Sequence, residues 1–249
     1  MISILLSGCN GKMGKTVTQY LANRDDCLIS AGVDLCLDAN GGYTVFNNYN
    51  DVVVDFDVIL DFSISSCLDD LLDFALKVKK PLVICTTGYS DKQIEKINLA
   101  SKQIPIFFSY NMSLGISLLT ELAIKAASIL GDEFDIEIIE KHHNNKIDAP
   151  SGTAYKIAEA INANNNEKFK YKFDRHSEKL KRNKNEIGIH SVRGGTIVGE
   201  HEVIFAGNDE LISLSHTAYS KTIFACGAIK AVKFICDKPN GIYSMKDLI

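Results

Sequence analysis

Short apolar runs alternate with longer segments of helical periodicity along the first half of the chain. The runs are rich in Ile, Val and Leu without regular polar alternation, which is typical of strands buried on both faces. Predicted strands occupy residues 2–6, 27–33, 58–62, 82–85 and 104–108. Predicted helices lie between them, one ending at about residue 21 and others spanning 66–79 and 91–102. This alternation predicts a parallel sheet with helices on both faces, a Rossmann-like α/β fold.

The second half has a different pattern, in which several strands follow one another. Strand-like alternation marks residues 134–140 and three segments separated by turns, at 187–193, 196–205 and 211–219. Helical periodicity marks residues 113–130, 152–163 and 221–235. Strand-rich sequence after an alternating half predicts a second α+β domain with an open mixed sheet. An open sheet exposes a face or an edge, so a subunit partner is expected.

A polar stretch rich in Asn and Lys, residues 162–186, interrupts this second half. It contains eight Lys and Arg residues against four Asp and Glu residues. The excess would allow a nucleic-acid-binding arm, but the interleaved acids break up the basic patch. A solvated variable loop is therefore favoured.

Composition narrows the class of protein. The formal charge of −4 over 249 residues argues against a general nucleic-acid binder. Seven cysteines are scattered without any Cys-x-x-Cys pair, which indicates reduced thiols rather than a disulfide framework or a zinc ribbon. The N-terminus lacks the basic region of a signal peptide, and no uninterrupted apolar span reaches membrane length. A cytoplasmic protein without a membrane partner is expected.

A glycine-rich turn follows the first predicted strand. Its sequence, Gly8-Cys-Asn-Gly-Lys-Met-Gly14, leads directly into a predicted helix. In strand–turn–helix units that bind dinucleotides, the first glycine permits the tight turn and the second allows close approach of the pyrophosphate. The third lets helix and strand pack closely. Asp34 ends the second strand, twenty residues beyond Gly14, where such folds bind the ribose hydroxyls; a solvated turn residue is the alternative.

Three further loops follow predicted strands, at residues 62–63, 86–88 and 109–113. Ligands of parallel sheets lie beyond the carboxyl ends of the strands. These loops are therefore candidates for the wall of a cofactor site.

The densest chemistry of the chain lies in residues 140–154, Glu-Lys-His-His-Asn-Asn-Lys-Ile-Asp-Ala-Pro-Ser-Gly-Thr-Ala. His142 or His143 can move protons near neutral pH, and Lys146 supplies a compact cation. The backbone amides of residues 151–153 begin a predicted helix and would face an anion. Together these groups predict a site for a small carboxylated substrate that needs a proton. A zinc site is the rival interpretation, but adjacent histidines without a helical i, i+4 pair make it weak.

These residues together resemble the dihydrodipicolinate reductases, the 4-hydroxy-tetrahydrodipicolinate reductases of bacterial and plant lysine and diaminopimelate synthesis. The resemblance covers nearly the whole chain and is carried by residues 8–14, 86–88, 140–154 and 193–201. Residues 140–154 are close to a family signature, whereas the glycine turn is shared with many dehydrogenases. The resemblance implies reduction of a cyclic dicarboxylate by NADH or NADPH, with loss of its hydroxyl as water. It also implies a homotetramer. No bound metal is expected.

The family pattern implies a role for each matching position. His142 matches the proton donor and Lys146 the second catalytic residue. Contacts to substrate carboxylates are implied for His143, Gly152 and Thr153. Dinucleotide contacts are implied for Gly8, Cys9, Asn10, Gly11, Lys12, Met13, Asp34, Cys85, Thr86, Thr87, Ser109, Tyr110, Asn111 and Met112. The dinucleotide-binding domain is expected to comprise residues 1–112 and 221–249, and the substrate-binding and oligomerisation domain residues 113–220.

Three positions depart from the family pattern. Cys85 stands where glycine is usual, and Met112 replaces a frequent phenylalanine. Leu35 follows the acidic residue at a position that is often arginine in relatives that bind the 2′-phosphate of NADP. Because a carboxylate near that phosphate is repulsive, Asp34 without a neighbouring arginine predicts that NADH is used at least as well as NADPH.

The residues fit this chemistry independently. Hydride addition to an unsaturated system conjugated to an imine builds negative charge, which an imidazolium can quench and Lys146 can stabilise. Two other classes remain: an NAD-dependent alcohol or aldehyde dehydrogenase with Lys146 as acid/base, and a redox sensor that binds NADH. The dehydrogenase does not need His142 and His143. The sensor needs no clustered proton donor and usually adds a DNA-binding segment.

Apolar alternation in the last strands bears on assembly. Ile197, Val203, Phe205, Ile212 and Leu214 suit a face buried against other subunits. The alternative is a monomer whose helices at 114–130 and 152–163 cover one face and leave the other solvated. The resemblance favours the oligomer.

Overall fold

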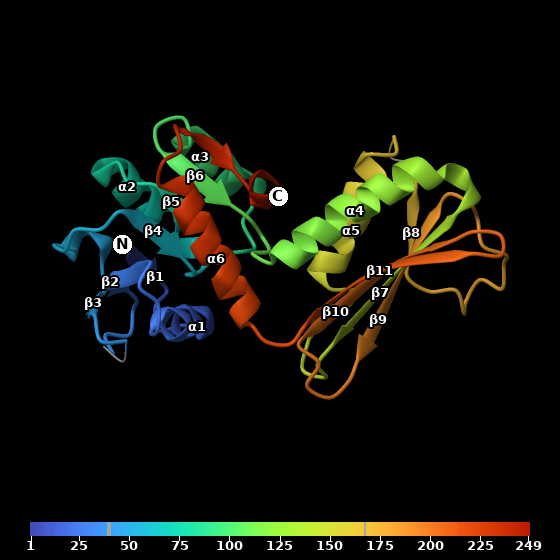
Figure 1. Cartoon of the computed structure of the whole chain (residues 1–249), viewed down its shortest axis with the longest axis horizontal. Coiled ribbons are helices and arrows are strands. Elements are labelled where there is room, and N and C mark those ends of the chain that lie inside the picture. Colours follow the sequence, from blue (N-terminus) through green and yellow to red (C-terminus); the bar gives the residue numbers. More distant parts are fainter. Residues whose placement is uncertain (39–40, 167) are drawn as a thin grey trace. The chain divides into compact units, whose positions relative to one another are not determined.

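The computed structural model describes residues 1–38, 41–166 and 168–249, and these form two compact units. The first unit comprises Met1–Leu114 and Lys221–Ile249, and the second comprises Gly115–Ser220. Figure 1 shows that each unit has its own sheet. The chain leaves the first unit once and returns to it with its last helix.

A parallel sheet of seven strands forms the centre of the first unit. Its order is β12-β6-β5-β4-β1-β2-β3, and every neighbouring pair runs parallel. The strands are β1 (Ile2–Ser7), β2 (Cys27–Val33), β3 (Thr44–Phe46), β4 (Val58–Asp61), β5 (Leu82–Ile84), β6 (Pro105–Phe108) and β12 (Gly241–Tyr243). From β1 the chain builds outward first on one side and then on the other, as in doubly wound nucleotide-binding folds. The predicted Rossmann-like sheet is confirmed.

Helices cover both faces of this sheet because successive strand residues point to opposite sides. The helices are α1 (Lys12–Leu21), α2 (Leu68–Val78), α3 (Asp91–Ala100) and α6 (Thr222–Ile235). Leu6 packs in a cluster with α1 and α6, whereas its neighbour Leu5 packs with α2 and α3. In β4, Leu60 likewise packs with α1 and α6, and Ile59 packs with α2 and α3. The apolar runs of the sequence are continuous because each strand contributes to two cores.

Two edge strands of the first unit were not predicted. β3 and β12 have three residues each, too few to show a strand pattern on their own. β12 follows Pro239 and begins at Gly241, two residue types that are uncommon inside strands. Each strand is defined by its pairing with one longer neighbour, β3 with β2 and β12 with β6.

A mixed sheet of five strands, ordered β11-β10-β7-β9-β8, forms the second unit. Its strands are β7 (Asp135–His142), β8 (Lys170–Lys172), β9 (Glu186–Arg193), β10 (Gly199–Ala206) and β11 (Leu211–Ala218). β7 and β8 run parallel to β9, whereas β10 pairs antiparallel with both β7 and β11. Two helices, α4 (Leu114–Leu130) and α5 (Gly152–Ala163), pack on one face of the sheet. The predicted open mixed sheet is confirmed.

The apolar alternation of β10 and β11 faces these helices. Val203 and Phe205 are fully buried in a cluster with residues of α4 and α5, and Leu214 packs against it. Ile212 lies opposite Phe205 on the edge strand, and Ile197 precedes β10 outside any strand. For Val203, Phe205 and Leu214 the prediction of an intersubunit face is therefore wrong, because helices of the same chain cover them.

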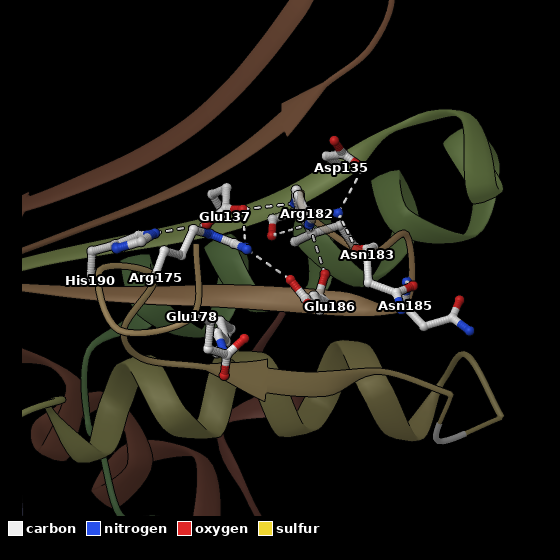
Figure 2. Close-up of polar contacts among 11 residues, drawn as sticks. Asp135, Glu137, Arg175, Glu178, Arg182, Asn183, Asn185, Glu186 and His190 are labelled. Carbon is white, nitrogen blue, oxygen red and sulfur yellow. Dashed lines mark hydrogen bonds and ion pairs between the residues drawn. The ribbon is translucent and has the colours of Figure 1, made fainter. Parts of the chain in front are cut away.

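Residues 168–186 of the polar stretch fold back onto the second sheet instead of remaining a fully solvated loop. They contribute β8 and two arginines whose side chains reach acidic residues of β7 and β9 (Figure 2). These ion pairs are Arg182 with Asp135 (2.7 Å) and Glu137 (2.9 Å), Arg175 with Glu186 (2.8 Å) and Glu137 (3.2 Å), and His190 with Glu137 (2.7 Å). The basic excess of the stretch is thus partly neutralised within the chain, which further disfavours a nucleic-acid-binding arm.

α4 is apolar over a greater length than was expected from the sequence. With the turn that follows, Leu114–Glu133 is the one described helical segment long and apolar enough to cross a membrane by length and composition alone. No such span had been predicted. One side of the helix, which includes Leu119 and Ala123, is buried in the cluster above the second sheet. A core helix of a folded unit has the same composition.

Candidate active site

Two glycines of the turn after β1 occupy positions that no other residue would fit. Gly8 has a φ of +72°, and a Cβ on it would lie 2.4 Å from the carbonyl oxygen of Phe62. A Cβ on Gly14 would lie 2.3 Å from the carbonyl oxygen of Gly8. The first glycine therefore permits the turn and its contact with the loop after β4. The third lets α1 begin against the turn itself, as predicted.

The N-terminus of α1 is suited to an anion. Gly11 is its N-cap residue, no side chain caps this end, and the first turn contains no acidic residue. Lys12 begins the helix and adds a positive charge. Backbone N–H groups and the helix dipole favour a negative group at such an end. The cradle fits the pyrophosphate of a dinucleotide.

Asp34 lies one residue past β2 and contacts the glycine turn. Its carboxylate accepts hydrogen bonds from the backbone N–H groups of Asn10, at 2.9 Å, and Cys36, at 3.1 Å. The side chain of Asn10 donates in turn to the carbonyl oxygen of Cys36 at 2.6 Å. A carboxylate has about four acceptor positions, so these bonds leave room for ribose hydroxyls. The solvated-turn alternative is disfavoured because the carboxylate is engaged.

The remaining candidate cofactor residues follow β1, β5 and β6 at the same edge of the sheet. Cys9 and Met112 bury their side chains in the core, so only their backbone atoms remain for a ligand. Cys85 is also buried, and burial raises its pKa well above the usual value. Ser109 hydrogen-bonds the backbone of Asn111 through its Oγ at 2.9 Å, which shapes the loop after β6. Cys9, Cys85 and Met112 therefore offer mainly backbone groups to a ligand.

The second cluster is built around β7. Residues of this strand alternate between buried and partly exposed, so Glu140 and His142 lie on the same, helix-covered face. Glu140 Oε2 and His142 Nδ1 are 2.6 Å apart, and both side chains are buried. Because Nδ1 is engaged by the carboxylate, Nε2 is the nitrogen left to exchange a proton.

Glu140 is held by more than His142. Arg193 at the end of β9 donates to both of its oxygens, each at 2.7 Å. The backbone N–H of Ser151, the N-cap residue of α5, donates to Oε1 at 3.0 Å. Burial acts to raise the pKa of this carboxyl, but the hydrogen bonds from Arg193 and His142 outweigh it and lower the pKa to about 2. Glu140 is therefore ionised at all ordinary pH values.

The surroundings of His142 favour proton donation from Nε2. Burial lowers the pKa of His142, and the Glu140 carboxylate opposes that shift. A Cβ on Gly199, the first residue of β10, would lie 3.1 Å from His142 Nε2. The glycine therefore keeps that nitrogen accessible. The ring of His201 lies edge-on to that of His142 at 5.3 Å, and burial, followed by the charge of His142, lowers its pKa to about 4. A neutral His201 adds no competing charge.

Lys146 and the N-terminus of α5 already hold a carboxylate. Lys146 Nζ lies 2.8 Å from Asp148 Oδ1. This ion pair is the largest cause of the lowered pKa of Asp148, and the backbone of Gly152 contributes to it. The backbone N–H of Lys146 donates to the carbonyl oxygen of His143. The Nδ1 of His143 is buried and has no hydrogen-bond partner among the residues that the structure describes. Two of the groups predicted to bind substrate carboxylates, Lys146 and the backbone of Gly152, thus bind an internal carboxylate in this structure.

Three residues of this cluster had no role in the sequence-based prediction. Glu140 opened the predicted motif without an assigned function, and Arg193 and His201 appeared only as the two ends of the segment 193–201 that carries the resemblance. Alternation along β7 could have placed Glu140 and His142 on one face. The pairing of Glu140 with His201, and of His142 with Arg193, depends on strand register, which the local pattern does not specify. Across the described residues, no group of three or more His, Cys, Asp or Glu side chains could hold a metal ion.

Two family models match nearly all of the chain. The model described as "Dihydrodipicolinate reductase, N-terminus" matches residues 2–112, and "Dihydrodipicolinate reductase, C-terminus" matches residues 115–249. A 4-hydroxy-tetrahydrodipicolinate reductase of Clostridium novyi (strain NT) is 48% identical over 249 residues, which cover 100% of this chain and 98% of the relative. The enzyme of that name from Clostridium tetani (strain Massachusetts / E88) is 49% identical over 245 residues, with coverages of 98% and 96%.

A solved structure supports the same grouping. The dipicolinate-bound dihydrodipicolinate reductase from Paenisporosarcina sp. TG-14 matches with a TM-score of 0.83 at 26% sequence identity. The match covers 100% of this chain and 100% of that one. Sequence and architecture therefore agree along the whole chain.

Proposed function

The chain belongs to the dihydrodipicolinate reductase family, and we propose how its residues carry out the family's reaction. It is an oxidoreductase that uses NADH or NADPH to reduce 4-hydroxy-tetrahydrodipicolinate to tetrahydrodipicolinate, with loss of water, in lysine and diaminopimelate biosynthesis. The observation that carries the proposal is the buried Glu140–His142 pair, which leaves one imidazole nitrogen to exchange a proton.

The first unit serves as the dinucleotide-binding domain in this proposal, and the second as the substrate-binding domain. The glycine turn and the N-terminus of α1 hold the pyrophosphate, and Asp34 binds the adenosine ribose. The backbones of the loops after β5 and β6 line the rest of the cofactor. Its contacts are Gly8, Cys9, Asn10, Gly11, Lys12, Met13, Asp34, Cys85, Thr86, Thr87, Ser109, Tyr110, Asn111 and Met112.

His142 donates the proton. A dinucleotide held by the first unit would supply the hydride, and the role of His142 is to protonate the negative charge that hydride addition leaves on the substrate. Glu140 accepts the Nδ1–H of His142 in both protonation states, so Nε2 is the atom that gains and releases the proton. The carboxylate also stabilises the imidazolium before transfer, which partly offsets the cost of burying a cation.

Lys146, His143 and the N-terminus of α5 at Gly152 and Thr153 hold the substrate carboxylates. Asp148 supports this assignment because it brings a carboxylate to the ammonium of Lys146 and to the helix N-terminus. A dicarboxylate would compete with Asp148 for these groups. Lys146 also lies near enough to His142 to lower its pKa, so its charge can stabilise the anion that His142 protonates.

Substitution of the proton donor tests the proposal. His142→Gln should lower kcat by about 10²-fold or more and change KM modestly, because a positioned general acid typically supplies a factor of ~10²–10⁴. NADH oxidation is measured with aspartate semialdehyde, pyruvate and the preceding synthase. His176→Gln, at an exposed histidine of the polar stretch, is the matched control and should retain wild-type rates. Near-full kcat in His142→Gln would remove this residue from the mechanism.

The proposal extends to assembly as a homotetramer. Because Val203 and Phe205 face the helices, their strand neighbour Ile204 lies on the opposite face of the second sheet, which α4 and α5 do not cover. Ile139 of β7 lies on that same face by the alternation of its strand. We assign the intersubunit contact to this side. Light scattering in moderate salt at micromolar concentration checks it, and a mass near the 27.4 kDa chain would contradict it.

The remaining proposal concerns location and partners. We infer a cytoplasmic enzyme that acts on small molecules and binds neither nucleic acid nor membranes. The charge of −4 and the pairing of Arg175 and Arg182 with acidic residues support it. Binding to membranes is measured by co-sedimentation with anionic vesicles, and binding to nucleic acid by retention on a nucleic-acid column. Salt-resistant binding to either would contradict the proposal.

A further inference from the structure

One buried carboxylate outside the proton-donating cluster joins three loops of the first unit. Asp61 is the last residue of β4, and its side chain is fully buried. Its Oδ1 accepts hydrogen bonds from Ser7 Oγ at 2.8 Å and from the backbone N–H of Ser63 at 3.1 Å, and its Oδ2 accepts one from Thr86 Oγ1 at 2.6 Å. In the described residues, no Lys or Arg side chain forms an ion pair with it.

The three donors belong to loops proposed to hold the dinucleotide. Ser7 ends β1 immediately before the glycine turn, Ser63 follows β4, and Thr86 follows β5. β1, β4 and β5 are neighbours in the sheet, so their carboxyl ends lie side by side. The loops also touch directly, because a Cβ on Gly8 would lie 2.4 Å from the carbonyl oxygen of Phe62. A shift of any one loop would therefore move the others.

We propose that Asp61 is a positioning residue for the dinucleotide, which fixes the glycine turn and the loops after β4 and β5 in their binding geometry. The inference rests on the proposed dinucleotide site of the first unit. It adds a residue whose side chain is buried beneath the site and acts through Ser7, Ser63 and Thr86.

A general packing role does not account for this arrangement. Burying a carboxyl group away from water is unfavourable, and an apolar residue of similar size would fill the same space without that cost. An apolar residue could not, however, accept bonds from three chain segments. Burial without a cation raises the pKa of Asp61, while the hydrogen bonds to it act in the opposite direction. The carboxyl is thus retained at an energetic cost where three ligand-binding loops meet.

Cofactor titration of three variants tests the inference. Asp61→Asn keeps the shape but loses one acceptor, and Thr86→Val removes a single donor at nearly constant shape. Asp73→Asn makes the same charge change at an exposed position of α2 and serves as the control. The Kd for NADH is measured by fluorescence, with the thermal midpoint of each protein recorded in parallel. Asp61→Asn should raise Kd by about tenfold and Thr86→Val by roughly threefold, because one buried hydrogen bond to a carboxyl is lost.

The outcomes distinguish a failure of the proposed dinucleotide site from a failure of the positioning role of Asp61. A wild-type protein that binds no NADH or NADPH would overturn the proposed dinucleotide site itself. A wild-type protein that binds NADH, with Asp61→Asn equal to it within twofold while only the thermal midpoint falls, would reduce Asp61 to a structural residue. If both single variants weaken binding, the double variant should weaken it by less than the product of the two factors, since Asp61 and Thr86 belong to one hydrogen-bond network. If Asp61→Asn does not fold, Thr86→Val and Ser7→Ala decide alone, and unchanged Kd values in both would refute the inference.

Discussion

Glu140→Gln isolates the electrostatic contribution of a buried carboxylate to proton transfer. The substitution keeps the shape of the side chain and removes its charge. In the native site this charge lies 2.6 Å from His142 Nδ1 and also binds Arg193 through two 2.7 Å bonds. The variant imidazolium therefore loses its carboxylate partner while its burial is unchanged. Burial already lowers the pKa of His142, so the loss should lower it further.

The size of the effect follows from the single bond that is lost. A hydrogen bond to a charged group contributes about 1.5–3 kcal/mol, and one pKa unit corresponds to about 1.36 kcal/mol. Loss of this bond should therefore lower the pKa of His142 further. Proton donation requires the imidazolium, so the alkaline limb of the pH–rate profile should move to lower pH. Above both values the rate should drop by about 10–100-fold, and it should approach the wild-type rate as the pH is lowered.

The assay is kcat/KM from NADH oxidation at closely spaced pH values, with the folded fraction checked at each by circular dichroism. Glu200→Gln is the matched control, because Glu200 lies on the neighbouring strand and pairs with Lys141 at 2.9 Å on the other face of the sheet. That variant should keep the wild-type profile. An alkaline limb that does not move in Glu140→Gln, or a loss of rate that is equal at every pH, would refute the reasoning.

Four further outcomes are expected. Lys146→Ala should raise KM and lower kcat together in steady-state kinetics, because the same ammonium binds the substrate and the developing charge; a change in only one constant would contradict this. Cofactor titration should show NADH bound at least as well as NADPH, because the Asp34 carboxylate repels the 2′-phosphate of NADPH. NADPH binding more than tenfold tighter than NADH would contradict this role of Asp34. Gly199→Ala should lower kcat by about tenfold with the fold intact by circular dichroism, since its methyl group crowds the Nε2 that lies 3.1 Å away; wild-type kcat would contradict it. Since the pKa of Glu140 is lowered to about 2, its contribution to stability should be complete above the ordinary carboxyl value, near 4.5, and be lost as pH falls from there toward 2. Denaturant unfolding of Glu140→Gln should show a weaker loss over that window.

The architecture was predictable because the buried strands of the first unit show it locally. Leu5 and Leu6 face opposite cores, so both are apolar, and a continuous run identifies a strand covered on both faces. Edge strands have no such requirement. β3 and β12 were missed because three residues paired on one side carry too little pattern. The face of the second sheet was assigned wrongly for a related reason, since alternation shows that one side is buried and does not say what buries it.

The candidate site was predictable to the extent that its residues are close in sequence. His142, Lys146 and Gly152 lie within one short segment, and a strand end followed by a turn and a helix brings them together. Arg193 and His201 reach the same place from β9 and β10, through pairing registers that depend on the whole sheet. Asp61 was read only as part of an apolar strand, because its donors come from segments separated by 54 and 25 positions. Contacts of that range cannot be derived from local pattern.

The return of α6 to the first unit has a consequence for synthesis on the ribosome. Seven residues of this helix, Ala225, Gly227, Ala228, Ile229, Ala231, Val232 and Ile235, are buried, and six of them share a core with β1 and β4. Translation delivers the helix only after the whole second unit has emerged. Until α6 is made, one face of the sheet in the first unit therefore remains partly uncovered. The second unit can already fold, because its core contains only its own residues. A chain whose synthesis ends before Thr222 would have a folded second unit and an exposed apolar surface on the first. Chaperones and proteases act on chains with such surfaces.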